Sequence, residues 1–188
     1  SQREKVLEIP LSEISDFPNH PFKVKAGEAM LEMADSVKQY GVLVPGLVRP
    51  KADGGYEMIA GHRRKKASEL AGRETMPCIV RNLDDDEATI IMVDSNLQRE
   101  SILPSEKAFA YKMKLEAMKR QAGRSSKEDN YSQVGNNFFT KTSSDELAMQ
   151  SGESKNQIFR YIRLTYLLPS ILEMVDDKRI AFNPAVEI

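Results

Sequence analysis

Apolar residues in the first 80 positions alternate between short runs and one-sided helical patterns. Four short apolar runs predict strands: residues 6–9, 46–49, 56–59 and 77–80. The two middle runs are joined by Asp53-Gly54-Gly55, which favours a hairpin because glycine adopts positive φ without steric cost. Apolar positions three and four residues apart predict a helix over 29–40, and a shorter helix is expected over 62–70. This mixture predicts a small α+β domain.

The pattern becomes purely helical after the acidic stretch at residues 84–87, whose carboxylates suit a helix N-terminus. Pro104 is expected in the first turn of a long helix, and Gln121–Ser143, which lacks periodicity, is expected to be a flexible connection. Helical patterning then resumes. We therefore expect an α+β fold in which a mixed domain over residues 1–100 precedes an all-α domain over residues 101–188.

Composition limits the classes of function. The 188 residues are 40% hydrophobic, which is enough for one substantial core or two small ones. Lys and Arg number 27 and Asp and Glu 28, so the formal charge of -1 excludes a globally basic nucleic-acid binder. The single Cys78 excludes an intrachain disulfide. No apolar run approaches the roughly 18 residues of a membrane span, so we expect a cytoplasmic protein without a membrane partner.

Basic charge is concentrated in one stretch. Between Lys107 and Lys127 there are seven basic residues and one acid, Glu116, so the local balance is seven minus one, or plus six. A solvated helix face and a surface that contacts phosphates both explain this charge, and the sequence leaves the two open.

Residues 144–165 have the spacing of a helix-turn-helix. Small Ala148 lets two helices approach, Gly152 suits a turn of positive φ, and Ser154 suits the N-cap of a second helix whose buried face includes Ile158. The polar residues of that helix are the types that contact phosphates and base edges: Ser154, Lys155, Asn156, Arg160 and Arg163. An ordinary helical hairpin is the alternative.

A second candidate site lies where Gly61 leads into the helix over 62–70. Arg63, Arg64 and the two lysines after them oppose the helix dipole at its N-terminus. A bound phosphate would remove this conflict, because the free N-H groups and the guanidinium groups would all face its oxygens. A basic cluster on the surface is the alternative.

A third cluster is the polar stretch at residues 94–100, which follows an apolar helical run. Asp94 and Asn96 offer oxygen ligands for a metal, and Arg99 offers charge for an anion bound to that metal. A helix C-terminus exposed to water is the alternative.

Together these motifs resemble ParB-type chromosome and plasmid partition proteins. The matching segments are Gly41-Val42-Leu43-Val44-Pro45, Gly61-His62-Arg63-Arg64, Ser95-Asn96-Leu97-Gln98-Arg99-Glu100 and the helix-turn-helix. The resemblance implies a ParB/sulfiredoxin-like N-terminal domain that binds CTP with Mg²⁺. It also implies these nucleotide-binding residues: Gly41, Val42, Leu43, Pro45, Gly61, His62, Arg63, Arg64, Asn96 and Arg99. Asn96, with Asp94, is the implied metal site.

The resemblance also implies partners. It predicts a homodimer that recognises a double-stranded parS-like site, closes into a DNA clamp when CTP binds, and works with a ParA-type ATPase. The chain ends shortly after Asn183-Pro184, a dipeptide that suits the start of a new helix, so we expect the C-terminal dimerisation domain of the family to be absent.

The chain departs from the family in three motifs. Ser95 replaces the usual Glu before Asn96, His62 replaces a Glu, and His20-Pro21-Phe22 lies where the family has Gln-Pro-Arg. We therefore expect CTP to be bound more securely than it is hydrolysed, and the chain to be at most a weak CTPase.

Other functions remain open at this point. The same motifs suit a ParB-like transcriptional regulator or a nucleoid occlusion protein, and a ParB-like nuclease would need a carboxylate cluster for two metals. Sulfiredoxin chemistry needs a reactive Cys where this chain has Gly61, and Cys78 is expected to be a small core residue.

Overall fold

The computed structural model describes residues 4–128 and 142–188, with the backbone alone for residues 125–128. The chain divides into two compact units, Ser1–Asp84 and Asp85–Ile188. The division lies before the boundary near residue 100 that the sequence pattern predicts. Its physical reason is that α3 (Asp85–Leu97) packs extensively on α4 (Pro104–Glu128).

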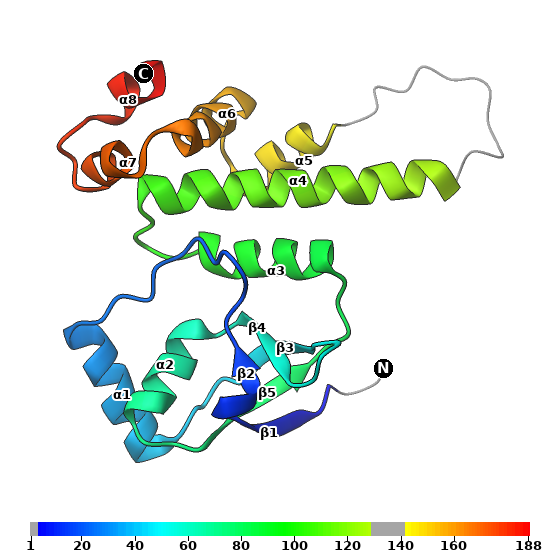
Figure 1. Ribbon diagram of the computed structural model, residues 1–188, viewed down its shortest axis with the longest axis vertical. Coiled ribbons are helices and arrows are strands. Elements are labelled where there is room, and N and C mark those ends of the chain that lie inside the picture. Colours follow the sequence, from blue (N-terminus) through cyan, green and yellow to red (C-terminus); the bar gives the residue numbers. More distant parts are fainter. Residues whose placement is uncertain (1–3, 129–141) are drawn as a thin grey trace. The chain divides into compact units, whose positions relative to one another are not determined.

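The first unit contains a five-stranded sheet with the order β1-β5-β3-β4-β2 (Figure 1). Its strands are β1 (Val6–Pro10), β2 (Ile14–Ser15), β3 (Gly46–Pro50), β4 (Tyr56–Ala60) and β5 (Thr75–Val80). A 3-10 turn, η1 (Leu11–Glu13), separates β1 from β2. The β1/β5 and β3/β4 pairs are antiparallel, whereas β3/β5 and β2/β4 are parallel. The four strands expected from the sequence are confirmed, and the short β2 is an addition.

Two helices complete this unit. α1 (Glu28–Tyr40) and α2 (His62–Leu70) pack on each other through Met30, Ala34, Val37 and Ala67. α2 also contacts β3 and β5, so the pair covers the sheet (Figure 1). The inner face of the sheet buries Val48, Met58, Met76 and Cys78 completely. These contacts fix the start of α2, where one candidate site lies.

The second unit is entirely helical within the described residues. Besides α3 and α4 it contains α5 (Ser143–Ser151), α6 (Lys155–Arg163), the 3-10 turn η2 (Leu164–Tyr166), α7 (Pro169–Asp176) and α8 (Phe182–Glu187). Helices α5, α6 and α7 all pack against α4. The α4 helix continues to Glu128, so the connection expected from Gln121 was placed too early. The remainder of that expected connection, residues 129–141, lies outside the described residues.

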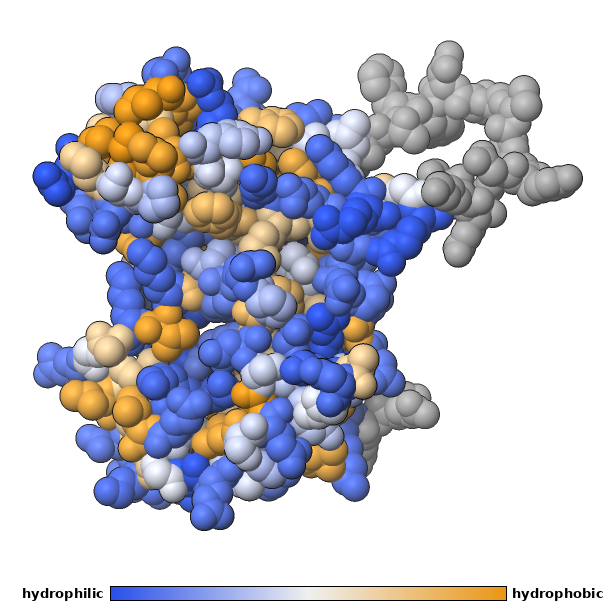
Figure 2. All heavy atoms as spheres, in the orientation of Figure 1, coloured by the Kyte–Doolittle hydropathy of each residue, from blue (hydrophilic) through white to orange (hydrophobic). Residues whose placement is uncertain are grey.

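The expected α+β class, with a mixed unit followed by a helical one, is confirmed. Among the described residues no helix has both the length and the apolar character needed to cross a membrane. Hydrophilic side chains dominate the visible surface, notably along the C-terminal part of α4, and apolar side chains gather in the region of α6 to α8 (Figure 2).

Candidate functional site

The strand-to-helix junction at Gly61 brings two sequence motifs together. Gly61 has φ of 112°, and a Cβ atom there would lie 3.2 Å from Gly46 Cα, so only glycine suits this close approach. The Arg64 guanidinium donates from Nη1 to the carbonyl oxygens of Val44 (2.6 Å) and Pro45 (2.7 Å). Burial lowers the pKa of Arg64. One side chain therefore fastens the 41–45 segment to the first turn of α2.

The basic residues at the start of α2 are only partly balanced. Lys65 Nζ lies 2.8 Å from an Asp16 carboxylate oxygen, and Lys66 Nζ lies 3.6 Å from Glu69. Arg63 is exposed and makes no ion pair within the described part of the chain. No side chain caps the helix at Gly61. Uncapped N-H groups beside an exposed guanidinium can bind an anion.

The two histidines of the chain meet beside this helix start. The rings of His20 and His62 lie 3.9 Å apart between centroids. Phe17 N donates to His62 Nε2 over 3.2 Å, and the Phe22 carbonyl accepts from His20 Nδ1 over 2.7 Å. His62 is buried at 6% exposure. Its Nε2 therefore already accepts a hydrogen bond from the backbone, which gives this nitrogen a structural role.

A pocket of about 300 Å³ opens at these histidines. It is lined by Asp16, His20, Phe22, Val24, His62, Lys65, Lys66 and Glu69. Burial alone would raise the pKa of Asp16, but the hydrogen bond and charge of Lys65 outweigh burial and lower that pKa. The pocket therefore offers a mixed set of charges, with its cations balanced by acids.

Asp94, Asn96 and Arg99 belong to the second unit, whereas the Gly61 motif belongs to the first. Asn96 is buried, and its amide nitrogen donates to the Met92 carbonyl over 2.8 Å. Within the described residues no cluster of three His, Cys, Asp or Glu side chains is arranged to hold a metal.

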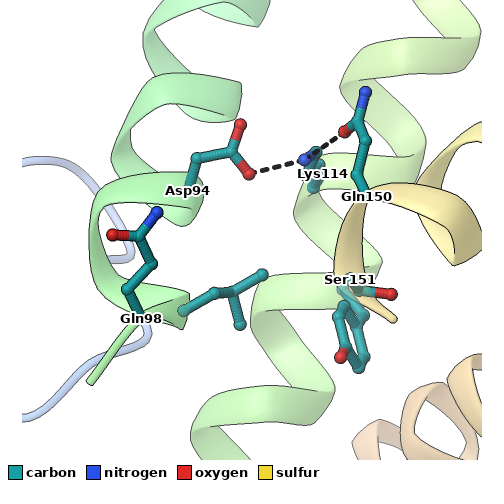
Figure 3. A pocket seen from close by; sticks show the side chains of 7 residues that line it. Asp94, Gln98, Lys114, Gln150 and Ser151 are labelled. Atoms are coloured by element: carbon teal, nitrogen blue, oxygen red, sulfur yellow. Dashed lines mark hydrogen bonds and ion pairs between the residues drawn. The ribbon is translucent and has the colours of Figure 1, made fainter. Parts of the chain in front are cut away.

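Lys114 is a functional candidate that the sequence interpretation missed. Its side chain is 2% exposed, and Nζ contacts Asp94 Oδ1 over 2.5 Å and Gln150 Oε1 over 2.6 Å (Figure 3). The three side chains come from α4, α3 and α5, around a pocket of about 450 Å³. The signal was its position: Lys114 lies three residues after Tyr111 and four before Met118, on the buried face of α4.

Other cations of the basic stretch are also paired. Lys107 forms an ion pair with Glu153, and both Arg120 and Arg124 bind the buried carboxylate of Asp86. Four of the seven cations in this stretch, Lys107, Lys114, Arg120 and Arg124, therefore contact acids of the second unit, although the side chains of Arg120 and Arg124 remain more than half exposed.

The helix-turn-helix geometry is present in α5 and α6. Gly152 has φ of 71°, and the Ser154 hydroxyl caps α6 by accepting from Gln157 N over 3.1 Å. Ile158 is fully buried beside Leu147 and Tyr111. Each of these features was expected from the spacing of the sequence.

The candidate DNA-binding side chains fall into two groups. Lys155 pairs with Asp145 over 2.8 Å, and Arg160 donates to Asn183 Oδ1 over 2.8 Å. In contrast, Ser154, Asn156 and Arg163 are exposed. The second helix therefore presents a polar outer face, part of whose charge is held by neighbouring side chains.

Cys78 does not support thiol chemistry. It is fully buried in the core of the sheet, and burial, followed by the charge of Glu8, raises its pKa to about 11. A thiol of that pKa is almost entirely protonated near neutral pH. Cys78 is a small core residue, as expected.

Comparison with known proteins decides the family. A family model of the ParB N-terminal domain matches residues 1–97, which is more than half of the chain. The chain belongs to the ParB family. The chromosome-partitioning protein Spo0J of Thermus thermophilus is 34% identical to this ParB-type chain over 171 residues, covering 91% of this chain and 55% of its own length. A nucleoid occlusion protein of Listeria innocua is 32% identical over 180 residues. This match covers 95% of this chain and 55% of the Listeria protein.

Structural comparison agrees with the ParB assignment. A crystal structure of the C-terminally truncated ParB of Caulobacter crescentus with its centromeric parS site has a TM-score of 0.57 and 24% identity, and covers 96% of this chain and 82% of that one. The likeness shows a shared fold. The chain spans about half the length of the curated relatives it matches.

Proposed function

We propose that this chain is the nucleotide-binding and DNA-binding part of a ParB-type partition protein, which recognises a parS-like duplex through α6. The observation that carries this proposal is the capped helix-turn-helix with Asn156 and Arg163 exposed on its second helix. Its relatives include proteins named for chromosome partitioning, which supports a role in segregation. The cytoplasmic nucleoid or a plasmid is the expected location.

CTP is the proposed nucleotide, with the start of α2 as its phosphate site. The uncapped N-H groups, the exposed Arg63 and the close backbone approach at Gly61 suit phosphate oxygens. The 41–45 segment, which Arg64 holds beside this turn, is the proposed base-side contact. Closure into a DNA clamp, a homodimer and a ParA-type partner belong to this proposal as consequences of family membership.

Mg²⁺ fits the candidate residues only in part. Asp94 is already neutralised by the Lys114 ammonium, which disfavours a second cation beside it. Asn96 is the better candidate, because its amide nitrogen is anchored on Met92 and its oxygen is the atom that a metal would use. Mg²⁺ held there would neutralise phosphate charge.

Substitution of α6 tests the DNA-binding role. We expect Arg160→Ala and Arg163→Ala each to weaken binding to a cognate duplex by about 1 to 3 kcal/mol, measured by fluorescence anisotropy at moderate salt. Arg179→Ala is the matched control, because Arg179 is an exposed arginine after α7. Equal affinity of all three variants and the unchanged protein would contradict DNA reading by α6.

Calorimetry with CTP, ATP and GTP tests the nucleotide site. We expect CTP to bind most tightly and Arg63→Ala to weaken it, whereas Lys66→Ala, whose cation already pairs with Glu69, has a smaller effect. Tighter binding of a purine nucleotide would contradict the assignment.

Hydrolysis is expected to be slow. His62, which replaces the usual Glu, is buried and accepts a hydrogen bond from Phe17, so this nitrogen is not available to activate water. A phosphate-release assay should show little CTP turnover, and His62→Glu tests whether the family's usual carboxylate raises that turnover.

Nucleoid occlusion is the second candidate function, supported by the Listeria innocua relative. Both functions use the same DNA-binding helix. Mapping of bound sites across the genome separates them, because partition predicts a few sites clustered near an origin or a plasmid partition locus.

A further inference from the structure

The outer face of α6 contains an aromatic side chain. Phe159 is 42% exposed, whereas its neighbour Ile158 is fully buried. Asn156, Phe159 and Arg163 are spaced by three and four residues, so they follow one another along the same face of the helix. A large apolar side chain therefore lies in the middle of the face that we propose for DNA.

Packing within the second unit does not explain this position. The core beneath α5 and α6 is formed by Tyr111, Leu115, Met118, Leu147 and Ile158, with partly buried neighbours that do not include Phe159. A second apolar group under α6 to α8 likewise consists of other residues. Phe159 keeps much of its apolar surface in water. Contact with a partner would remove that surface from water and stabilise the complex.

The cations on either side of Phe159 are oriented by neighbouring groups. Arg160 is directed toward Phe182 and Asn183 of α8, with its guanidinium carbon 5.3 Å from the Phe182 ring centroid. Lys155 is directed toward Asp145 of α5. This arrangement leaves the middle of the outer face of α6 to Phe159, with Asn156 on one side and Arg163 on the other.

In the major groove, the chemical group that a phenylalanine ring can recognise is the 5-methyl group of thymine. Asn and Arg on the same face read the hydrogen-bonding edges of purines. We propose that Phe159 is a specificity-determining residue, which packs on the 5-methyl group of one thymine in the DNA site. This inference rests on the proposed DNA-binding function and assigns it a base-reading contact.

The test replaces single methyl groups in the DNA. The 188-residue chain is first used to enrich a duplex from a random pool. Each thymine of that duplex is then replaced, one at a time, by deoxyuridine, which lacks only the 5-methyl group. We expect affinity to fall by about fourfold at one thymine, or at one in each arm of an inverted repeat, which is the effect of losing one buried methyl group.

Substitution of Phe159 completes the test. Phe159→Ala should bind the thymine and deoxyuridine duplexes equally at that position and keep its sensitivity to changes at other bases. Phe159→Leu should retain part of the methyl effect. Phe109→Ala is the matched control, because Phe109 is a similarly exposed phenylalanine (39%) on α4, and it should behave as the unchanged protein.

The outcomes separate this inference from the proposed function. If no sequence is enriched over the pool, DNA reading itself fails. If a duplex is enriched but every deoxyuridine substitution is neutral, or if Phe159→Ala keeps the methyl effect, the role of Phe159 is overturned while DNA binding stands. Circular dichroism of Phe159→Ala checks that the helices are intact, as expected for an exposed side chain.

Discussion

Single side chains in this protein have roles that depend on their neighbours more than on their type. Arg63 and Arg64 are adjacent, yet Arg63 is exposed and Arg64 binds two backbone carbonyls. Asp145 likewise does two things, since it closes a capping box with Thr142 and pairs with Lys155.

Asp145 should make stability depend on acid pH. Hydrogen bonds from Lys155 and then Thr142 lower its pKa from 3.8 to about 2. A carboxylate whose pKa is lower in the folded state contributes stability that is fully present above about pH 4 and is lost as the pH falls toward about 2. We expect the difference in melting temperature between the unchanged protein and Asp145→Asn to shrink over that interval, as followed by circular dichroism. Asp177→Asn, at an exposed acid, is the control, and a pH-independent difference would contradict the assignment.

Cys78 should resist alkylation while the protein is folded. Its pKa of about 11 leaves on the order of one thiol in a thousand ionised at pH 8, and the side chain is fully buried. Mass spectrometry after iodoacetamide treatment should show labelling only in denaturant. Rapid labelling of the folded chain would place Cys78 outside the core.

At the scale of elements, the buried Lys114 joins three helices. It holds Asp94 of α3 and Gln150 of α5 from its own position on α4 (Figure 3). Helix α3 includes Asn96, a proposed nucleotide contact, and α5 is the first helix of the helix-turn-helix. This contact therefore joins the end of α3, which carries Asn96, to the first helix of the helix-turn-helix.

The two partners of this ion pair should differ in their effect on stability. Asp94→Ala leaves a buried cation without its carboxylate, and we expect it to lower the free energy of unfolding by about 1 to 3 kcal/mol, because the carboxylate is half exposed and its loss is partly offset by water. Lys114→Met fills the same space with an apolar side chain and leaves Asp94 near water, so the change should be below about 1 kcal/mol. Urea unfolding measures the free energy of unfolding of both variants, and a larger decrease for Lys114→Met than for Asp94→Ala would contradict this expectation.

The start of α6 provides a simpler prediction. Ser154 caps the helix through its hydroxyl, so Ser154→Ala should destabilise the protein by about 1 kcal/mol and Ser154→Asn should not. Thermal unfolding of the unchanged protein and the two variants measures this difference in stability. Equal melting temperatures would show that the cap contributes nothing.

At the scale of the whole molecule, much of the basic charge of α4 is paired with acids. Lys107, Lys114, Arg120 and Arg124 of α4 each contact an acid of the second unit. Of the cations of α6, Arg163 is exposed, whereas Lys155 pairs with Asp145 and Arg160 donates to Asn183. This distribution suits a protein whose affinity for DNA depends on reading its sequence more than on general attraction.

The salt dependence of DNA binding tests this distribution. Three cations of α6 in contact with phosphates predict a slope of log K against log salt of about -3 per chain, whereas participation of the seven basic residues of α4 as well predicts about -9. Anisotropy titrations over a range of salt concentrations measure the slope. A value near the larger estimate would mean that the ion pairs of α4 open on DNA.

The sequence predicts local features better than distant contacts. Turn glycines such as Gly152, the Ser154 cap and the apolar faces of the helices follow from neighbours within a few residues, and all are present. The parallel pairing of β2 with β4 involves only two residues and has no periodic signal. The Lys114 contacts and the stacking of His20 on His62 join residues 20 to 42 positions apart, so spacing could not reveal them.

The strand order has a consequence for the behaviour of the protein at high concentration. One edge of the sheet is β2, only two residues long, and the other is β1, which contains the exposed Glu8 and ends at Pro10. Short edges, charged side chains and proline all hinder the pairing of a strand with a second chain. These edges therefore hinder the joining of sheets from neighbouring molecules into aggregates when the protein is concentrated.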